Sequence, residues 1–128
     1  MFGSKADGSR WKVGVKNPAD GGASVAAVLA LEGGMSVVTS GNYERFFISG
    51  DRLYHHIIDP KTGYPGENGV ASATIVASSS MEADAMSTSA FLMGEEAFRL
   101  AFPDASTLFI CSDGRLVASE QLVKSLLR

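Results

Sequence analysis

Short hydrophobic stretches separated by turns fill the first half of the chain, and in some, such as Trp11–Lys16, hydrophobic and polar residues alternate. This two-residue period is typical of half-buried β-strands. We expect strands at Trp11–Lys16, Ala23–Leu31, Met35–Thr39, Tyr43–Ile48, Arg52–Ile58 and Val70–Ala77. Ser49-Gly50-Asp51 lies between two of them and predicts a hairpin turn. The pattern of Met1–Lys5 is that of the end of a further strand running into a turn.

The pattern changes to that of helices after residue 78. Ser79 and Glu82 have the spacing of a capping box, so we expect a helix from there to Met93, ended by Gly94. The remaining residues predict a second short helix, a last hairpin and a terminal helix, at Glu95–Ala101, Ser106–Cys111 with Arg115–Ser119, and Glu120–Leu127.

Antiparallel strands with a few helices grouped late in the chain predict an α+β fold, mainly antiparallel sheet with the helices packed on it. A length of 128 residues fits a single domain, 1–128. The net charge of −3 excludes the basic surface of a nucleic-acid-binding protein. The single cysteine, Cys111, excludes an internal disulfide, and its place in a predicted strand indicates a small buried residue rather than a nucleophile.

Two adjacent histidines precede what should be a rigid turn. His55 and His56 lie near the end of a predicted strand, and Asp59–Gly63 (DPKTG) has the composition of a tight turn. Neighbouring side chains on a strand point to opposite faces, so only one of the two can face a given pocket. One interpretation is that the histidine facing the pocket is catalytic. The alternative is a pair of structural histidines beside a hairpin corner.

Asp84 lies on a predicted helix that is hydrophobic nearly all round. We expect such a helix to be buried, and a buried carboxylate is costly unless it is paired or bound to a metal. Thr88 follows one turn later on the same face, so the two oxygens can share one Mg²⁺. Two alternatives stay open: the helix dipole favours an acid near the helix start, and the Thr88 hydroxyl can bond to the Asp84 carbonyl.

Three segments resemble, in order and spacing, the motifs of the ApbE family of FAD:protein FMN transferases. They are Ser40–Phe47 (SGNYERFF), His56–Pro65 (HIIDPKTGYP) and Ala83–Gly94 (ADAMSTSAFLMG). The resemblance implies the C-terminal part of the ApbE-like fold. It also implies a reaction in which FAD is split, FMN is attached through its phosphate to a Thr or Ser hydroxyl of an acceptor protein, such as a redox-complex subunit, and AMP leaves.

The resemblance assigns roles to particular residues. It makes His56, and not His55, the general base, and it makes Asp84 and Thr88 ligands of Mg²⁺. It places the backbone near Ile58, together with His56, against FAD. Ser40 and its neighbours form a turn entering a strand in this interpretation, with Tyr43 able to line the pocket.

The resemblance covers only the C-terminal part of family members, so we expect the N-terminal half, with much of the FAD pocket, to be absent. Met1 aligns inside a strand of the family. The face left open predicts that copies of the chain can associate. Members are usually periplasmic or inner-membrane lipoproteins, whereas this chain shows no signal peptide. Two alternatives are a Mg²⁺-dependent FAD pyrophosphatase, and a non-catalytic flavin-binding or interaction module.

Overall fold

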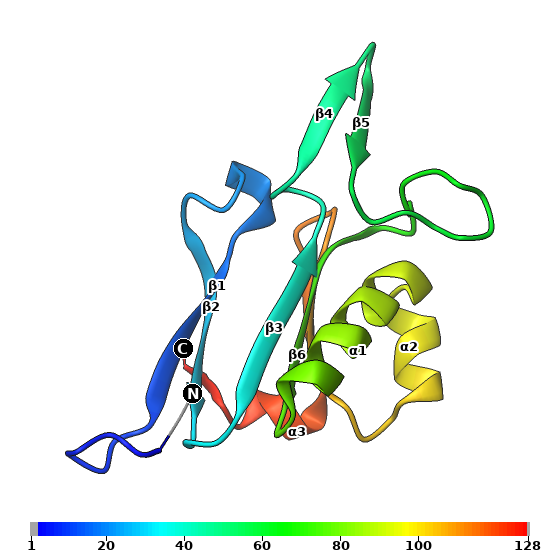
Figure 1. Cartoon of the computed structure of the whole chain (residues 1–128). Helices are drawn as coiled ribbons and strands as arrows, with labels where there is room; N and C mark the ends of the chain where they lie inside the picture. Colours follow the sequence, from blue (N-terminus) through cyan, green and yellow to red (C-terminus); the bar gives the residue numbers. More distant parts are fainter. Residues whose placement is uncertain (1–2, 128) are drawn as a thin grey trace.

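Three layers of secondary structure make up the computed structural model, which describes residues 3–127 (Figure 1). The central layer is an antiparallel sheet with the strand order β3-β6-β7-β8. Its strands are β3 (Ser36–Gly41), β6 (Val70–Ala77), β7 (Ser106–Cys111) and β8 (Leu116–Ala118). The predicted α+β class is confirmed.

The outer layers lie on opposite faces of the central sheet. One consists of α1 (Ser80–Met93) and α2 (Glu95–Ala101). The other is a second antiparallel sheet of order β1-β2-β9 with strands at Trp11–Lys16, Val25–Leu31 and Leu126–Leu127. Helix α3 (Glu120–Val123) and a 3₁₀-helix at Pro18–Asp20 lie in connections.

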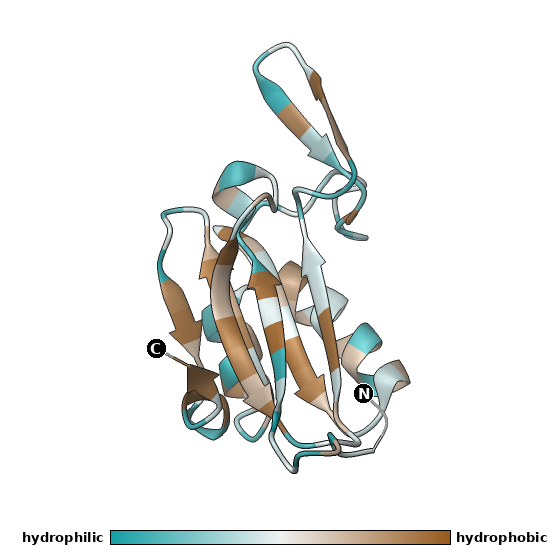
Figure 2. Ribbon diagram, turned by 90° about the vertical axis from the view of Figure 1, so that its left-hand side faces the viewer, coloured by the Kyte–Doolittle hydropathy of each residue, from teal (hydrophilic) through white to brown (hydrophobic). Residues whose placement is uncertain are grey.

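The buried side chains explain this layering. Seven of the eight residues of β6 are buried, so both faces of that strand are covered. Its Ala73 and Ile75 pack with Phe91 of α1 and Phe98 of α2, whereas Val76 packs with the second sheet. A strand buried on both faces needs a layer on each side. Figure 2 shows hydrophobic residues concentrated on the strands of the two sheets.

Local signals explain the bounds of the helices. The Ser79 side chain accepts a hydrogen bond from the Glu82 backbone N–H at 3.3 Å and begins α1, as predicted. Gly94 has a φ of 83° and ends α1. A positive φ is easily adopted only by glycine, which is why the helix stops there.

Three predicted elements were wrong in extent by three residues or more. The strand predicted at Tyr43–Ile48 is found at Phe46–Ser49, because residues 42–45 turn the chain away from the preceding strand. The terminal helix ends at Val123 instead of Leu127, because Leu126 and Leu127 pair with Leu29 and Val28 of β2. This pairing joins residues far apart in sequence, so no local pattern shows it. The strand predicted to end at Ile58 ends at His55, because the Ile57 N–H is bound by the His55 ring at 3.3 Å. The prediction for Met1–Lys5 falls partly on residues outside those described.

Strands β4 (Phe46–Ser49) and β5 (Arg52–His55) form the predicted hairpin, which projects from the body of the molecule (Figure 1). Several of its apolar side chains are exposed to solvent: Phe47 is 64% and Ile48 66% exposed. Among the described residues, no helix has the length and hydrophobicity needed to cross a membrane.

Candidate functional site

The turn after the two histidines is held by the side chain and the backbone of Asp59. Asp59 Oδ1 accepts from the Lys61 N–H at 2.9 Å, and the Asp59 carbonyl accepts from the Gly63 N–H at 2.8 Å. Gly63 has a φ of 72°, as a turn of this kind requires. Ile58 and Pro65 pair across the turn, which makes the whole corner a fixed element.

His55 is a structural residue. Its ring is 5% exposed and meets the Phe91 ring edge-on at 5.4 Å between centroids. Nδ1 accepts from the Ile57 N–H, so the proton of the neutral ring is on Nε2, which donates to the Gly66 carbonyl at 3.1 Å. Burial lowers the pKa of His55. Both nitrogens are occupied within the protein, so this ring is unsuited to exchanging protons with a substrate.

The lowered pKa of His55 predicts a dependence of stability on pH. The unfolded chain binds a proton at this ring more readily than the folded chain does. The contribution of His55 to the free energy of unfolding is therefore complete above the ordinary histidine pKa of about 6.5. It is lost as the pH falls through that value towards the lowered pKa. We expect urea denaturation to show a free energy of unfolding that falls from about pH 7.5 to 5.5 more steeply in the native chain than in His55→Gln. Parallel profiles would contradict this.

His56 has the opposite environment. Its side chain is exposed, and its Nδ1 lies 3.3 Å from the Arg45 carbonyl. A carbonyl can only accept, so Nδ1 carries the proton and Nε2 is left as a proton acceptor. The alternation of the two histidines is confirmed. The ring that the resemblance selects as a general base is the one with an available nitrogen.

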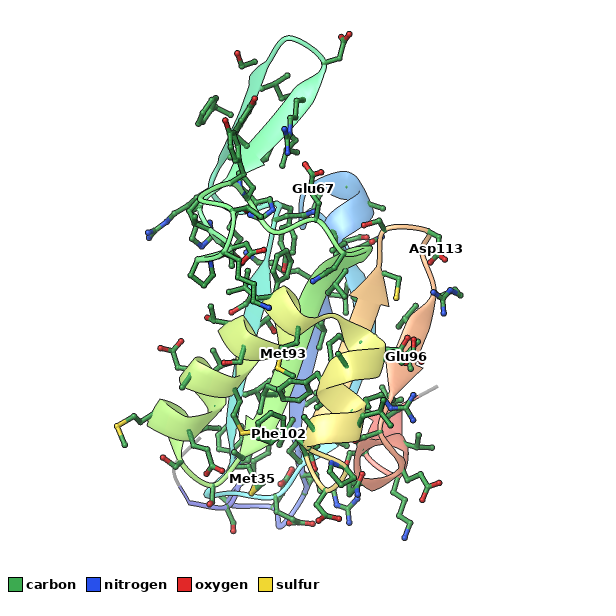
Figure 3. All side chains as sticks on the ribbon, turned by 90° about the vertical axis from the view of Figure 1, so that its right-hand side faces the viewer. Met35, Glu67, Met93, Glu96, Phe102 and Asp113 are labelled. Carbon is green, nitrogen blue, oxygen red and sulfur yellow. The ribbon has the colours of Figure 1, made fainter. Side chains whose placement is uncertain are left out.

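The loop that carries His56 is tied to the C-terminal end of α1. Asn68 Nδ2 donates to the carbonyls of Phe91 and Leu92, at 2.7 and 3.0 Å. Gly66 lies so close to α1 that an added Cβ would stand 2.8 Å from Leu92 Cδ2. In Figure 3 the loop with Glu67 lies above the end of α1 at Met93. These contacts fix the histidine loop relative to the helix.

Arg52 ties the same loop to the hairpin. Its guanidinium pairs with Glu67 at 3.0 Å and lies 5.5 Å from the centroids of both the Tyr54 and Tyr64 rings. Ile58 is 46% exposed on the loop between them. Ile58 thus lies at the surface of a segment that is held on both sides.

Asp84 and Thr88 do not have the surroundings that the sequence predicted. The expectation of a helix buried all round was wrong. One face of α1 is buried, with Ala83, Ser87 and Phe91, and both Asp84 and Thr88 are exposed. Alanine, serine and methionine tolerate solvent as well as burial, so their periodicity did not define a face. The charge on Asp84 is therefore hydrated, and burial cost cannot be an argument for a metal.

The donor chemistry at Asp84 and Thr88 still fits Mg²⁺. In residues 3–127, no group of three or more His, Cys, Asp or Glu side chains could hold a metal. Mg²⁺, however, is commonly held by one or two protein oxygens, with water and phosphate oxygens completing its shell. A carboxylate and a hydroxyl one turn apart provide two hard oxygens on one exposed face. They would hold the ion together with a bound phosphate.

His56 and the candidate metal ligands lie on two segments that are attached to each other at the C-terminal end of α1. At a rise of 1.5 Å per residue, Thr88 lies about 6 Å and Asp84 about 12 Å along α1 from Leu92, where the histidine loop is attached. Within the described residues, no hydrogen bond or ion pair joins His56 to either residue.

A model of the ApbE family matches residues 1–107 of the chain. The chain belongs to the ApbE family. Among curated relatives, the FAD:protein FMN transferase of Treponema pallidum is 44% identical over 116 residues, covering 88% of this chain and 32% of that protein. The Escherichia coli K12 protein of the same name is 37% identical over 95 residues, covering 73% and 26%.

Solved ApbE structures share the fold. The ApbE protein of Thermotoga maritima has a TM-score of 0.86 and 39% identity, over 98% of this chain and 41% of that one. The flavin transferase ApbE of Vibrio cholerae has a TM-score of 0.75 and 30% identity, over 96% and 40%. This ApbE chain thus spans about a third of the length of the Treponema pallidum relative.

Sequence reasoning missed one ApbE residue beside the candidate metal ligands. Ser40, at the end of β3, lies 3.2 Å from the Thr88 hydroxyl and 2.8 Å from the Ser87 hydroxyl. It opens the SGNYERFF motif, which we interpreted as only a turn entering a strand. The signal was present in that motif, but the contact depends on the packing of α1 against β3.

Tyr43 of the same motif lies in a groove of about 640 Å³, which also receives Phe46, Leu53 and Leu116. Burial raises the pKa of the Tyr43 phenol, so this hydroxyl stays protonated at neutral pH. Cys111 also lines the groove as a buried residue, as predicted, and burial raises the pKa of its thiol. His56, Asp84 and Thr88 are not among the lining residues of this groove.

Proposed function

We propose that this chain supplies the base and the cation-binding helix of a Mg²⁺-dependent FAD:protein FMN transferase. The observation that carries the proposal is the His56 ring. It is exposed, its Nδ1 is engaged by a backbone carbonyl, and its loop is tied to the helix with Asp84 and Thr88. The names of the relatives at 37–44% identity support the same activity.

In the proposed reaction, a Thr or Ser hydroxyl of an acceptor protein attacks FAD. The hydroxyl oxygen bonds to the phosphorus of the FMN half, and the bond from that phosphorus to the bridging oxygen breaks. AMP leaves with the bridging oxygen. The hydroxyl proton passes to Nε2 of His56, whose orientation is held through Nδ1 by the Arg45 carbonyl.

Asp84 and Thr88 would hold the Mg²⁺, which when bound neutralises charge on the pyrophosphate oxygens. The backbone around Ile58 would contact the nucleotide, because the turn behind it is fixed by Asp59. We propose, from the resemblance to the family, that the whole protein acts on the outer side of the inner membrane.

The hairpin β4–β5 is the surface through which we propose that copies of the chain associate. Along β4, Phe46 and Ile48 lie on one face of the hairpin and Phe47 on the other, and each is at least 47% exposed. Exposed aromatic and aliphatic side chains in such a group are typical of contact surfaces. Gel filtration of the chain tests this part of the proposal.

The test uses the chain alone and a chimera in which it replaces the matching segment of the Treponema pallidum protein. Each is incubated with FAD, Mg²⁺ and an acceptor of that protein, and the Treponema pallidum protein is the positive control. Covalent flavin fluorescence on the acceptor, with one AMP per flavin, is expected at least for the chimera. AMP without an acceptor would indicate the pyrophosphatase, and FAD binding without AMP the non-catalytic module. A folded chimera without transfer would contradict the proposal.

A further inference from the structure

The hydroxyl groups of Ser40, Ser87 and Thr88 form a series of hydrogen bonds between β3 and α1. The donor of each bond can be derived. Ser87 Oγ lies 3.0 Å from the Asp84 carbonyl, which can only accept, so Ser87 gives its one proton there. Ser40 Oγ lies 2.8 Å from Ser87 Oγ and must therefore be the donor in that contact. Ser87 is fully buried and Ser40 is half-buried, so the Ser87 hydroxyl is shielded from solvent.

Because each hydroxyl has one proton to donate, the direction of the Thr88 proton follows as well. Ser40 has only one proton, and it is directed to Ser87. In the contact of 3.2 Å between Ser40 and Thr88, the donor is consequently Thr88. The hydroxyl protons run in one direction, from Thr88 to Ser40 to Ser87 to the Asp84 carbonyl. The outward side of the Thr88 oxygen is left with lone pairs only.

We propose that Ser40 is a positioning residue that holds the Thr88 proton inward, so that the Thr88 oxygen is presented as an acceptor at the exposed surface of α1. A hydroxyl whose proton points inward presents an oxygen to a hard cation without repulsion. Asp84 and Thr88 are both exposed on α1, and the series of hydrogen bonds runs from the Thr88 hydroxyl to the backbone carbonyl of Asp84. Partners behind a metal ligand commonly change metal affinity by about 10- to 100-fold when removed.

This inference rests on the cation site of the proposed function, and its test needs no turnover. The ¹⁵N-labelled chain is titrated with MgCl₂, with KCl at matched ionic strength as the reference. We expect saturable shifts of the amides of residues 84–88, which Asp84→Asn abolishes. Ser40→Ala should weaken the apparent affinity by about 10-fold. Ser40→Thr, which keeps the hydroxyl, should restore it to near the native value.

A second variant covers the case in which Ser40→Ala fails to fold. Ser87→Ala places alanine at a site already packed by Ala83 and Ala90, and it removes the acceptor of the Ser40 proton. We expect it to weaken Mg²⁺ binding as well. Native affinity in both variants, with binding lost in Asp84→Asn, would overturn the role of Ser40 and leave the proposed function intact. A native chain without saturable shifts in α1 would overturn the cation site itself.

Discussion

We expect His56→Ala to lower the rate of flavin transfer by about 10²- to 10⁴-fold, the range typical of a lost general base. The ring is exposed, so its removal should leave the fold intact. The effect should appear mainly in kcat, since the pyrophosphate and the ring systems of FAD would still meet the rest of the site. The measurement is the initial rate of covalent flavin incorporation in the chimera described above.

Two comparisons make this result specific to proton transfer. Added imidazole should restore part of the rate of His56→Ala, because a free base can enter the space that the side chain leaves. Lys12→Ala, an exposed substitution on β1, should keep the native rate. An unchanged rate in His56→Ala would remove His56 from the mechanism. A lower rate without imidazole rescue would assign it to binding.

The elements predicted best from the sequence are those whose ends are determined by single residues at those ends. Helix α1 begins after Ser79 and ends at Gly94, since a side-chain cap and a positive φ are properties of single residues. The DPKTG turn was predictable for the same reason, because Asp59 bonds within its own turn. Strand β6 was predicted with the bounds that it has, Val70–Ala77.

The parts that sequence could not provide depend on contacts between distant segments. Strand β9 exists because Leu126 and Leu127 extend the edge of β2, nearly one hundred residues away in the chain. The exposure of Asp84 depends on which face of α1 the central sheet covers. The role of Ser40 required knowing that β3 lies beside α1. The choice of His56 over His55 was suggested by family resemblance, and the hydrogen bonds of the two rings give it a physical reason.

Replacing Phe91 with alanine should lower the free energy of unfolding by about 3–5 kcal/mol. Its side chain is 0% exposed and packs in the core between α1, α2 and the central sheet. The cost combines lost burial with the cavity left behind, since neighbouring side chains relax only in part. Urea denaturation of the native chain and the variant measures it. Phe47→Ala, at 64% exposure, is the matched control and should cost at most about 1.5 kcal/mol, the value of its stacking on Tyr54.

The same substitution should loosen the candidate site before it unfolds the protein. The Phe91 ring meets His55 edge-on at the start of the histidine loop, and the substitution removes this contact while it keeps the Phe91 carbonyl that accepts from Asn68. Amide hydrogen exchange across residues 56–69 should accelerate more than exchange in β6, whose ladder bonds remain. Equal acceleration in both segments would show that Phe91 stabilises the domain as a whole, without a particular hold on the loop that carries His56.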